Sequence, residues 1–413
     1  MFKHYYNYSA FIILFAFSSI KPMVYDTAKY LPLFQKPFVI TPCVYGHGQI
    51  QPFFIRADEA QGDVERQPLP DLPGQYDLVC IINALLKSGK ISENPLRSDL
   101  QGLSSIPFVR EGRIDTQGIA FFYQWPIACN WYLGTSFLFI HVNSRAEFCL
   151  DTTALDISPG DKSYLFKLKE QLNKDLEVLP PLYSRTVFGD VVFFLKYNYF
   201  MPYTFKFRSI NFAPEVGVYI PTSPRSLLNN PASIPVGGER RWGAYFGFEN
   251  QYEVREDWFA KVMFRAIKRF KSNEEERLPI DNEPINYGAL KAFTGINPGW
   301  TFVFAPSVFL KGIREGLGIS VLYTVVAHLK DEVTSCSSSE ALPFNGLQPN
   351  IKEFERRSSW GSEHVSIGLF YDLAKERDCY RYPTVSLYWD IPVDWLISER
   401  SARTHCISLL VDF

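Results

Sequence analysis

The sequence predicts an all-β protein, a closed antiparallel β-barrel of about 12 strands. Three observations predict it: apolar residues recur at every second position, the connections alternate between short and long, and the last strand ends on Phe413. A two-residue period indicates a strand with one apolar face and one mixed face. Phe and Tyr, which favour strands, occur 35 and 23 times in the 413 residues.

The amino terminus predicts export. Basic Lys3 precedes the short apolar run Ala10–Phe17, and Ser18 offers a small residue for cleavage. This order is typical of a secretory signal peptide, and the apolar run is too short to span a membrane as a helix. We therefore expect a cleaved signal peptide at 1–18 and a periplasmic N-terminal segment at 19–48. The barrel itself is expected at 49–413.

The twelve expected strands are recognised by their alternation of apolar and polar residues. In Gly316–Leu329, for example, Ile319, Val321 and Tyr323 alternate with small or polar residues. In chain order the strands are Gln49–Arg56, Thr116–Trp125, Asn130–Val142, Val187–Tyr199, Tyr203–Tyr219, Arg241–Glu253, Glu256–Phe270, Trp300–Lys311, Glu315–Leu329, Ser359–Tyr371, Tyr382–Ile391 and Thr404–Phe413.

The connections between these strands differ in length in a regular way. The short ones are Pro126–Cys129, Phe200–Pro202, Val254–Arg255, Gly312–Arg314 and Asp372–Arg381; the long ones are Ala57–Asp115, Asn143–Thr186, Ile220–Arg240, Lys271–Gly299 and Lys330–Ser358. Short and long alternate along the whole chain, which places all long loops at one end of the barrel. Secreted sandwiches and lectin-like domains also alternate apolar and polar residues, but they have no reason to separate their loops by length.

The last strand carries a more specific signal. Its residues Ile407, Leu409, Val411 and Phe413 share one apolar face, and the chain ends on the aromatic residue. This ending resembles the closing strand of Gram-negative outer-membrane β-barrels, which the barrel-assembly machinery reads. The resemblance implies a transmembrane barrel in outer-membrane lipid, with short periplasmic turns and long extracellular loops. It implies no substrate.

Two segments depart from the strand pattern and predict short helices within the long loops. Tyr76–Leu86 is followed by Gly89, a typical helix stop. Ser163–Val178 places Leu165, Leu168, Leu172 and Leu176 at helical spacing. Each helix could cover the outer mouth of the barrel, fold inward as a constriction, or pack on its own loop.

The search for catalytic and cofactor motifs leaves few candidates. The net charge of −2 gives no basic field, so no nucleic-acid partner is expected, and no metal or cofactor is expected either. The seven Cys residues show neither zinc-site spacing nor a disulfide framework. His328 and His364, on the presumed inner faces of neighbouring strands, could approach each other and form a two-histidine metal site. His141, Asn143 and Ser144 near the outer rim resemble the residue types of outer-membrane phospholipases. The acidic loop around Glu274–Glu276 could bind Ca²⁺.

The charged residues of the strands suggest a lumen. Eight residues lie opposite the apolar rows or on presumed inner faces and are predicted to line a pore: Lys196, Lys206, Arg208, Glu249, Lys261, Arg265, His328 and His364. Because most are basic, the sequence favours a channel or uptake pore for small solutes with a preference for anions. The alternatives are an interior filled by ion pairs, an outer-membrane enzyme acting on lipid, and a surface-exposed binding or adhesion barrel. We expect no enzymatic activity, and the sequence leaves open which solute is carried and whether the lumen is plugged.

Overall fold

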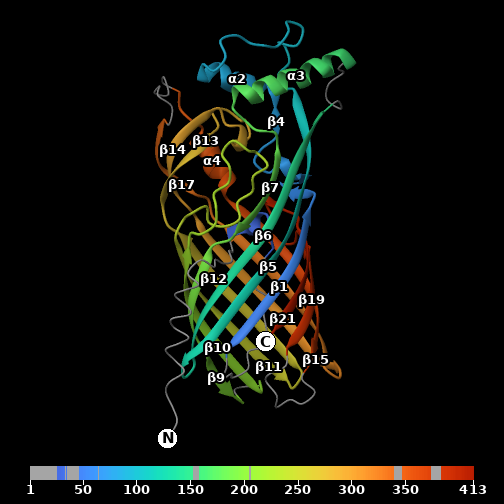
Figure 1. The fold of residues 1–413 in the computed structure, drawn as a ribbon, viewed down its shortest axis with the longest axis vertical. Helices are drawn as coiled ribbons and strands as arrows, with labels where there is room; N and C mark the ends of the chain where they lie inside the picture. The colour runs from blue at the N-terminus through green and yellow to red at the C-terminus, as the bar shows by residue number, and fades with distance from the viewer. Residues whose placement is uncertain are drawn as a thin grey trace.

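The computed structural model describes residues 26–32, 34, 46–63, 65–151, 158–203, 206–338, 347–373 and 383–413. Twelve antiparallel strands form one closed sheet, as predicted (Figure 1). Around the barrel they follow in the order β1 (His47–Ala57), β5 (Pro107–Ala128), β6 (Trp131–Leu150), β8 (Val191–Tyr197), β10 (Ser209–Ile220), β11 (Gly243–Arg255), β12 (Trp258–Arg269), β15 (Trp300–Arg314), β16 (Leu317–His328), β18 (Trp360–Asp372), β19 (Thr384–Pro392) and β21 (His405–Asp412).

The barrel closes where the first strand meets the last. β1 pairs with β5 on one side and with β21 on the other. The final residue completes this seam, because Phe413 and Gly48 exchange two backbone hydrogen bonds of 2.8 and 2.9 Å. Closure leaves no strand edge in the barrel wall, which a bilayer requires since unpaired backbone groups in hydrocarbon cost several kcal/mol each.

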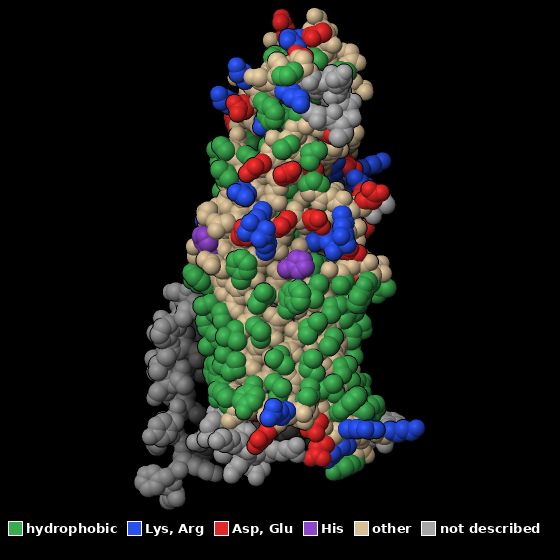
Figure 2. All heavy atoms as spheres, turned by 90° about the vertical axis from the view of Figure 1, so that its right-hand side faces the viewer, with side chains coloured by type: hydrophobic (Ala, Val, Ile, Leu, Met, Phe, Trp, Pro, Cys, Tyr) green, Lys and Arg blue, Asp and Glu red, His purple; other side chains and the backbone are tan. Residues whose placement is uncertain are grey.

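The two faces of the wall are distinguished as the sequence predicts. Ile407, Leu409 and Phe413 are exposed on the outer face, and Cys406, Ser408 and Leu410 between them are buried inside. Figure 2 shows the result as a broad hydrophobic band over the lower part of the molecule, with charged side chains gathered above it. This band is the lipid-facing surface expected of a transmembrane barrel.

The two ends of the barrel differ as the connection lengths predicted. The turns at one end, here the short-turn end, are brief, and the other end, the long-loop end, carries most of the remaining structure (Figure 1). Its small elements are β2 (Glu59–Gln61), β3 (Arg66–Pro68), η2 (Leu69–Asp71), β4 (Tyr76–Asp77), η3 (Ile285–Tyr287), α4 (Ile351–Ser358) and β20 (Ser401–Ala402). A separate sheet is formed there by β13 (Ser272–Leu278), β14 (Leu290–Asn297) and β17 (Glu332–Ser338).

Both expected helices are present at the long-loop end. α2 (Leu78–Ser88) begins where the Asp77 carboxylate accepts two backbone N–H groups, and it ends at Gly89 with a left-handed φ of 71°. α3 (Pro159–Asp175) packs with it in one hydrophobic cluster that includes Phe108 and Leu150 from the extended tops of β5 and β6. The helices therefore stand above the barrel on their own loops (Figure 1) and do not constrict its interior. In the described part of the chain no helix is long and apolar enough to cross a membrane.

The strand bounds differ from expectation most at β5 and β6: β5 begins at Pro107, nine residues before the predicted start, and β6 ends at Leu150, eight residues after the predicted end. A further difference lies between β6 and β10. β7 (Leu182–Phe188) pairs with the upper part of β6, whereas β8 pairs with its lower part, and Gly189 and Asp190 separate the two. β9 (Tyr199–Pro202) pairs antiparallel with the start of β10, which begins at Ser209, six residues later than predicted. This shift changes the position of two predicted site residues.

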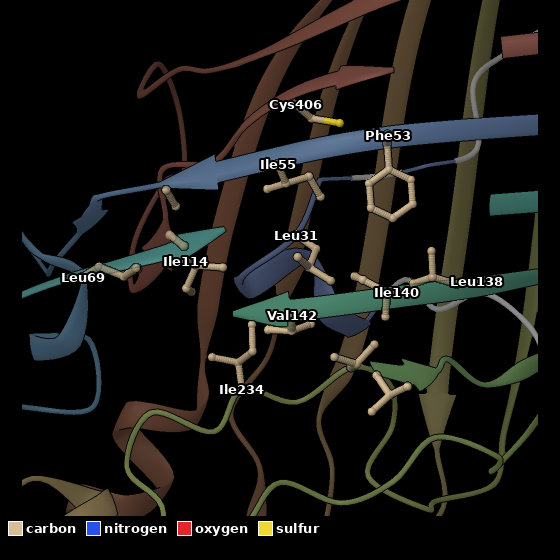
Figure 3. Packing of buried hydrophobic residues seen from close by; sticks show 14 of the residues in the cluster. Leu31, Phe53, Ile55, Leu69, Ile114, Leu138, Ile140, Val142, Ile234 and Cys406 are labelled. Atoms are coloured by element: carbon tan, nitrogen blue, oxygen red, sulfur yellow. The ribbon is translucent and has the colours of Figure 1, made fainter. Parts of the chain in front are cut away.

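A short N-terminal segment lies inside the barrel. Its described residues are 26–32, which include η1 (Asp26–Lys29), and Phe34. Leu31 is buried against inward side chains of β1, β5 and β6 (Figure 3). Phe34 is buried in the same cluster. This part of the segment expected to be periplasmic thus occupies the lumen. The expected signal peptide, 1–18, lies outside the described residues.

Candidate functional site: the barrel interior

One inner wall, made by β8, β10, β11 and β12, carries a network of buried ion pairs. Antiparallel pairing turns every second residue of these strands inward and so brings Lys196, Glu249 and Lys261 together. Glu249 Oε2 lies 2.6 Å from Lys196 Nζ and 3.0 Å from Lys261 Nζ. All three side chains are at most 2% exposed. A carboxylate therefore joins two lysines within the wall.

The network continues toward the long-loop end. Arg265 forms an ion pair with Glu215, and its guanidinium also lies over the Tyr245 ring, 5.2 Å from the centroid. Higher on the same wall Arg269 lies 2.9 Å from Asp190. Each basic group on this wall is thus matched by a carboxylate or an aromatic face, which removes much of the penalty of burying it.

Asp190 also fixes a long loop over this wall. Its carboxylate accepts backbone N–H groups from Thr222, Ser223 and Gly238 at 3.1, 3.0 and 2.7 Å. Gly237 has a φ of 145°, and a Cβ there would lie 2.2 Å from the Ser223 hydroxyl oxygen, so a larger residue would not fit. The loop that follows β10 is held inward, and its Ile234 reaches the interior cluster around Leu31 (Figure 3).

Inward-facing charges of both signs occur on the barrel wall. On the network wall, the four basic side chains Lys196, Lys261, Arg265 and Arg269 face the three carboxylates Glu215, Glu249 and Asp190. Two more carboxylates, Asp390 and Asp412, point inward from β19 and β21. Among these named side chains four positive charges meet five negative ones, so they do not form the positive wall that the sequence suggested.

The N-terminal segment connects opposite sides of the lumen. Ala28 belongs to a hydrophobic cluster with residues of β8, β10, β11, β12, β15 and β16. Leu31 and Phe34 belong to a different cluster, built from β1, β5, β6 and Cys406 of β21. The Phe34 and Phe53 rings lie 4.2 Å apart between centroids. Between Ala28 and Phe34 the segment therefore packs against both clusters.

The predicted site residues fall into three groups. Lys196, Glu249, Lys261 and Arg265 come together in the network. Lys206 and Arg208 do not join it: they are exposed in the turn before β10, where Arg208 forms ion pairs with Glu253 and Glu256. The reason is the later start of β10, which leaves both residues outside the barrel wall.

The two predicted histidines point inward but do not meet. In the β16–β18 register, His364 lies opposite Thr324 and His328 lies opposite Trp360, four positions away. His364 Nε2 is 3.0 Å from Thr404 Oγ1, and His328 Nε2 is 3.0 Å from Asp331 Oδ1. At a rise of about 3.3 Å per residue the histidines cannot share a metal ion.

The residues considered for lipid hydrolysis do not form a catalytic group. His141 and Ser144 lie on opposite faces of β6, because an odd spacing along a strand reverses the side chain. His141 Nδ1 contacts Thr186 Oγ1 at 2.9 Å on the outer face, and Ser144 is buried on the inner face. A hydroxyl nucleophile and its base must lie within hydrogen-bond reach, which this geometry prevents.

The acidic loop partly gathers its carboxylates. Glu239, Glu274 and Glu276 each place an oxygen within 4.8 Å of the others, beside a polar cavity of about 80 Å³. Glu274 is also bound by Arg241 and Arg225, at 3.0 and 3.1 Å. Burial raises the pKa of Glu276 to about 8. The two arginines and a protonated Glu276 balance the charge here, so a bound cation is not required.

Sequence reasoning missed the N-terminal segment and the Asp190–Arg269 pair. The segment lacks strand periodicity, and nothing in its short run of residues marks it as an interior element. Asp190 does carry a signal, since Gly189-Asp190 interrupts an otherwise apolar strand.

Comparison with known proteins supports the fold. No protein-family model and no curated protein matches the sequence. Among solved structures, an outer-membrane channel from Pseudomonas putida F1 is similar with a TM-score of 0.51, over 90% of this chain and 96% of that chain, at 8% sequence identity. The monoaromatic hydrocarbon channel TodX, as a deltaS2S3 mutant, gives a TM-score of 0.37 at 10% identity, over 89% of each chain. The NanC porin gives 0.34 at 8% identity, over 74% of this chain and 98% of that chain. The first of these likenesses shows a shared barrel fold and nothing more.

Proposed function

We propose that this protein is an outer-membrane channel for small solutes, and that its own N-terminal segment closes it in the conformation described. The observation that carries the proposal is the packing of Ala28, Leu31 and Phe34 against opposite walls of the lumen. Barrels of eight strands are filled by their wall side chains, whereas those of 16–18 strands enclose open channels. A twelve-strand barrel lies between these sizes and uses a separate piece of chain to fill its excess space.

A channel differs from a solid barrel in whether the groups that occupy its interior can leave it. The network of β8–β12 belongs to the wall and cannot leave without unfolding the barrel. The N-terminal segment precedes the first barrel strand in the chain and packs through apolar contacts of Ala28, Leu31 and Phe34. Such a segment can be displaced while every strand pair stays intact, which makes it a suitable gate.

The selectivity of the open channel follows from the ion pairs. The sequence suggested a preference for anions because Lys196, Lys261 and Arg265 face inward. Each of these groups has a carboxylate partner, so the charges of the wall are balanced. We propose passage of small solutes with little discrimination by charge. A preference for anions requires that opening separates the lysines from Glu249.

The proposed location is the bacterial outer membrane, with the long loops outside the cell. Export by the signal peptide at 1–18 and insertion by the barrel-assembly machinery would place the protein there. The outward row of Ile407, Leu409, Val411 and Phe413 is available for recognition by that machinery, because it faces away from the lumen.

Planar-bilayer recording tests the proposal. The full chain and the variant Leu31→Asp would be inserted into bilayers, with assembly of both checked by slower gel migration after boiling than before. We expect rare current steps from the full chain and frequent ones from the variant, since a carboxylate at Leu31 cannot stay in an apolar cluster. An assembled variant that remains as silent as the full chain would exclude gating by this segment.

A further inference from the structure

A loop on the outer wall of the barrel presents three consecutive large apolar side chains. Trp395, Leu396 and Ile397 are 64%, 74% and 38% exposed. They lie between β19 and β20, in a connection that leaves the sheet after Pro392 and returns to pair with β18 at Glu399. Exposed apolar residues usually occur singly in a soluble surface, so a continuous group of three indicates a binding surface.

The loop is built around one buried carboxylate. Glu363 is 2% exposed, and its two oxygens accept the backbone N–H groups of Trp395, Leu396 and Ile397. Its distances to the Trp395 and Leu396 nitrogens are 2.8 and 2.9 Å. With three N–H groups directed at one carboxylate, the backbone turns inward and the three side chains are directed away from the wall.

Two further contacts fix the position of this loop. A Cβ on Gly361 would lie 2.1 Å from the Ile397 carbonyl oxygen, so glycine is needed for the loop to approach β18. The Trp395 ring lies 5.3 Å from that of Tyr323, which faces outward on β16. The exposed apolar group is therefore a fixed part of the structure.

The outer surface on either side of the loop indicates which environment the loop contacts. Toward the short-turn end the outer wall continues with Val321, Ile367 and Trp389, which are 46%, 42% and 49% exposed and belong to the lipid-facing band. On the long-loop side the neighbouring Asp394 forms ion pairs with Arg66 and Arg403. The loop thus lies where the apolar band gives way to charged residues.

We propose that residues 393–398 form a membrane anchor whose Trp395, Leu396 and Ile397 insert into the boundary between headgroups and acyl chains of the surrounding leaflet. Its partner is lipid, because the exposed group continues the lipid-facing band without interruption. Trp and Tyr favour this depth, where the ring is in hydrocarbon and the polar edge meets headgroups. By fixing the loop, Glu363 acts as a positioning residue that sets how deep the barrel sits.

Depth-dependent fluorescence quenching tests the anchor. The chain has eight Trp residues, so the contribution of each is obtained as the difference between the full chain and a Trp→Phe variant. The protein would be placed in phosphatidylcholine vesicles whose acyl chains carry bromine either near the headgroup or near the bilayer centre. We expect the Trp395 contribution to fall at least twofold with bromine near the headgroup and less with bromine near the centre.

Two other tryptophans provide internal controls. Trp389 lies within the band and should be quenched by the deeper bromine, whereas Trp360 is buried inside the barrel and stacked on His328, so neither lipid should affect it. The proposal is overturned if the Trp395 contribution is insensitive to both bromolipids and is quenched by aqueous acrylamide. Shielding from lipid and acrylamide alike, together with dimers that Leu396→Asp abolishes, would assign the surface to a second copy of the chain and also overturn it.

A second variant tests whether Glu363 positions the anchor loop. Glu363→Ala removes the acceptor of the three N–H groups, and we expect at least half of the quenching of Trp395 by the shallow bromolipid to be lost while the barrel still assembles. The matched control is Glu399→Ala, a partly exposed carboxylate of the same connection that accepts none of these N–H groups. Equal quenching in the two variants would show that Glu363 does not position the loop.

Discussion

The barrel interior is filled in two different ways. On the wall of β8–β12 the filling consists of charged side chains that belong to the strands, with Glu249 joining Lys196 and Lys261. Against the wall of β1, β5 and β6 it consists of a separate segment held by apolar contacts of Leu31 and Phe34. The first kind of filling belongs to the strands themselves, whereas we propose that the second can be withdrawn. The proposed opening of the lumen therefore depends on the segment and not on the ion-pair network.

Removal of the Glu249 carboxylate should produce the largest loss of stability. Glu249→Ala leaves two buried lysines without their shared partner, and loss of one member of a buried ion pair costs about 3–5 kcal/mol. We expect the free energy of unfolding, measured by denaturant titration in lipid, to fall by this amount. Glu256→Ala is the control, because its exposed pair with Arg208 should contribute at most about 1 kcal/mol. Equal losses would mean that the network does not stabilise the wall.

Shortening the Leu31 side chain should destabilise the packed N-terminal segment and leave the stability of the barrel unchanged. Leu31→Ala creates a cavity at a fully buried site, which destabilises the packed segment by about 2–5 kcal/mol. We expect faster hydrogen exchange in residues 26–34 with an unchanged denaturation midpoint of the barrel. Leu179→Ala, at a site that is 53% exposed, should change neither. If Leu31→Ala lowers the denaturation midpoint of the whole barrel, the segment is part of the wall structure and is not a gate.

A change of pH should have a weaker effect on the packing of the segment. Burial lowers the pKa of Lys29 from 10.5 to about 8, against the opposing influence of Asp331 and Glu239. Between about pH 8 and pH 10.5 the displaced segment then binds more protons than the packed one, so packing becomes more favourable as the pH rises through this window. We expect a lower open fraction in bilayers at pH 10 than at pH 7.5. Lys29→Met should remove this difference, and an unchanged pH dependence in that variant would assign it to another group.

The sequence predicted the barrel wall well because the bilayer imposes its pattern locally. Alternation within single strands located all twelve, and closure follows from the need to pair every strand edge. The first residues of the strands were predicted less accurately. β10 begins at Ser209, so Lys206 and Arg208 lie outside the barrel interior.

The contents of the lumen could not be predicted in the same way. Lys196 and Glu249 meet across β10, which lies between their strands, so their pairing depends on the register of three strands. The basic residues were recognised as inward-facing, but their partners could not be assigned from one chain. The N-terminal segment has no period at all, and only the closed barrel shows where it packs.

The most direct test of the account is a reversible covalent lock on the segment. Phe34 and Phe53 face each other with ring centroids 4.2 Å apart, so in the double variant Phe34→Cys/Phe53→Cys a short bis-methanethiosulfonate reagent can join the two thiols through mixed disulfides that a reductant cleaves. Cys406 belongs to the same cluster and would be replaced by Ala in all variants, with the two single cysteine variants as controls. In planar bilayers we expect no current steps from the cross-linked double variant and restored steps after reduction. Equal conductance before and after reduction of the cross-linked protein would contradict closure of the lumen by its N-terminal segment.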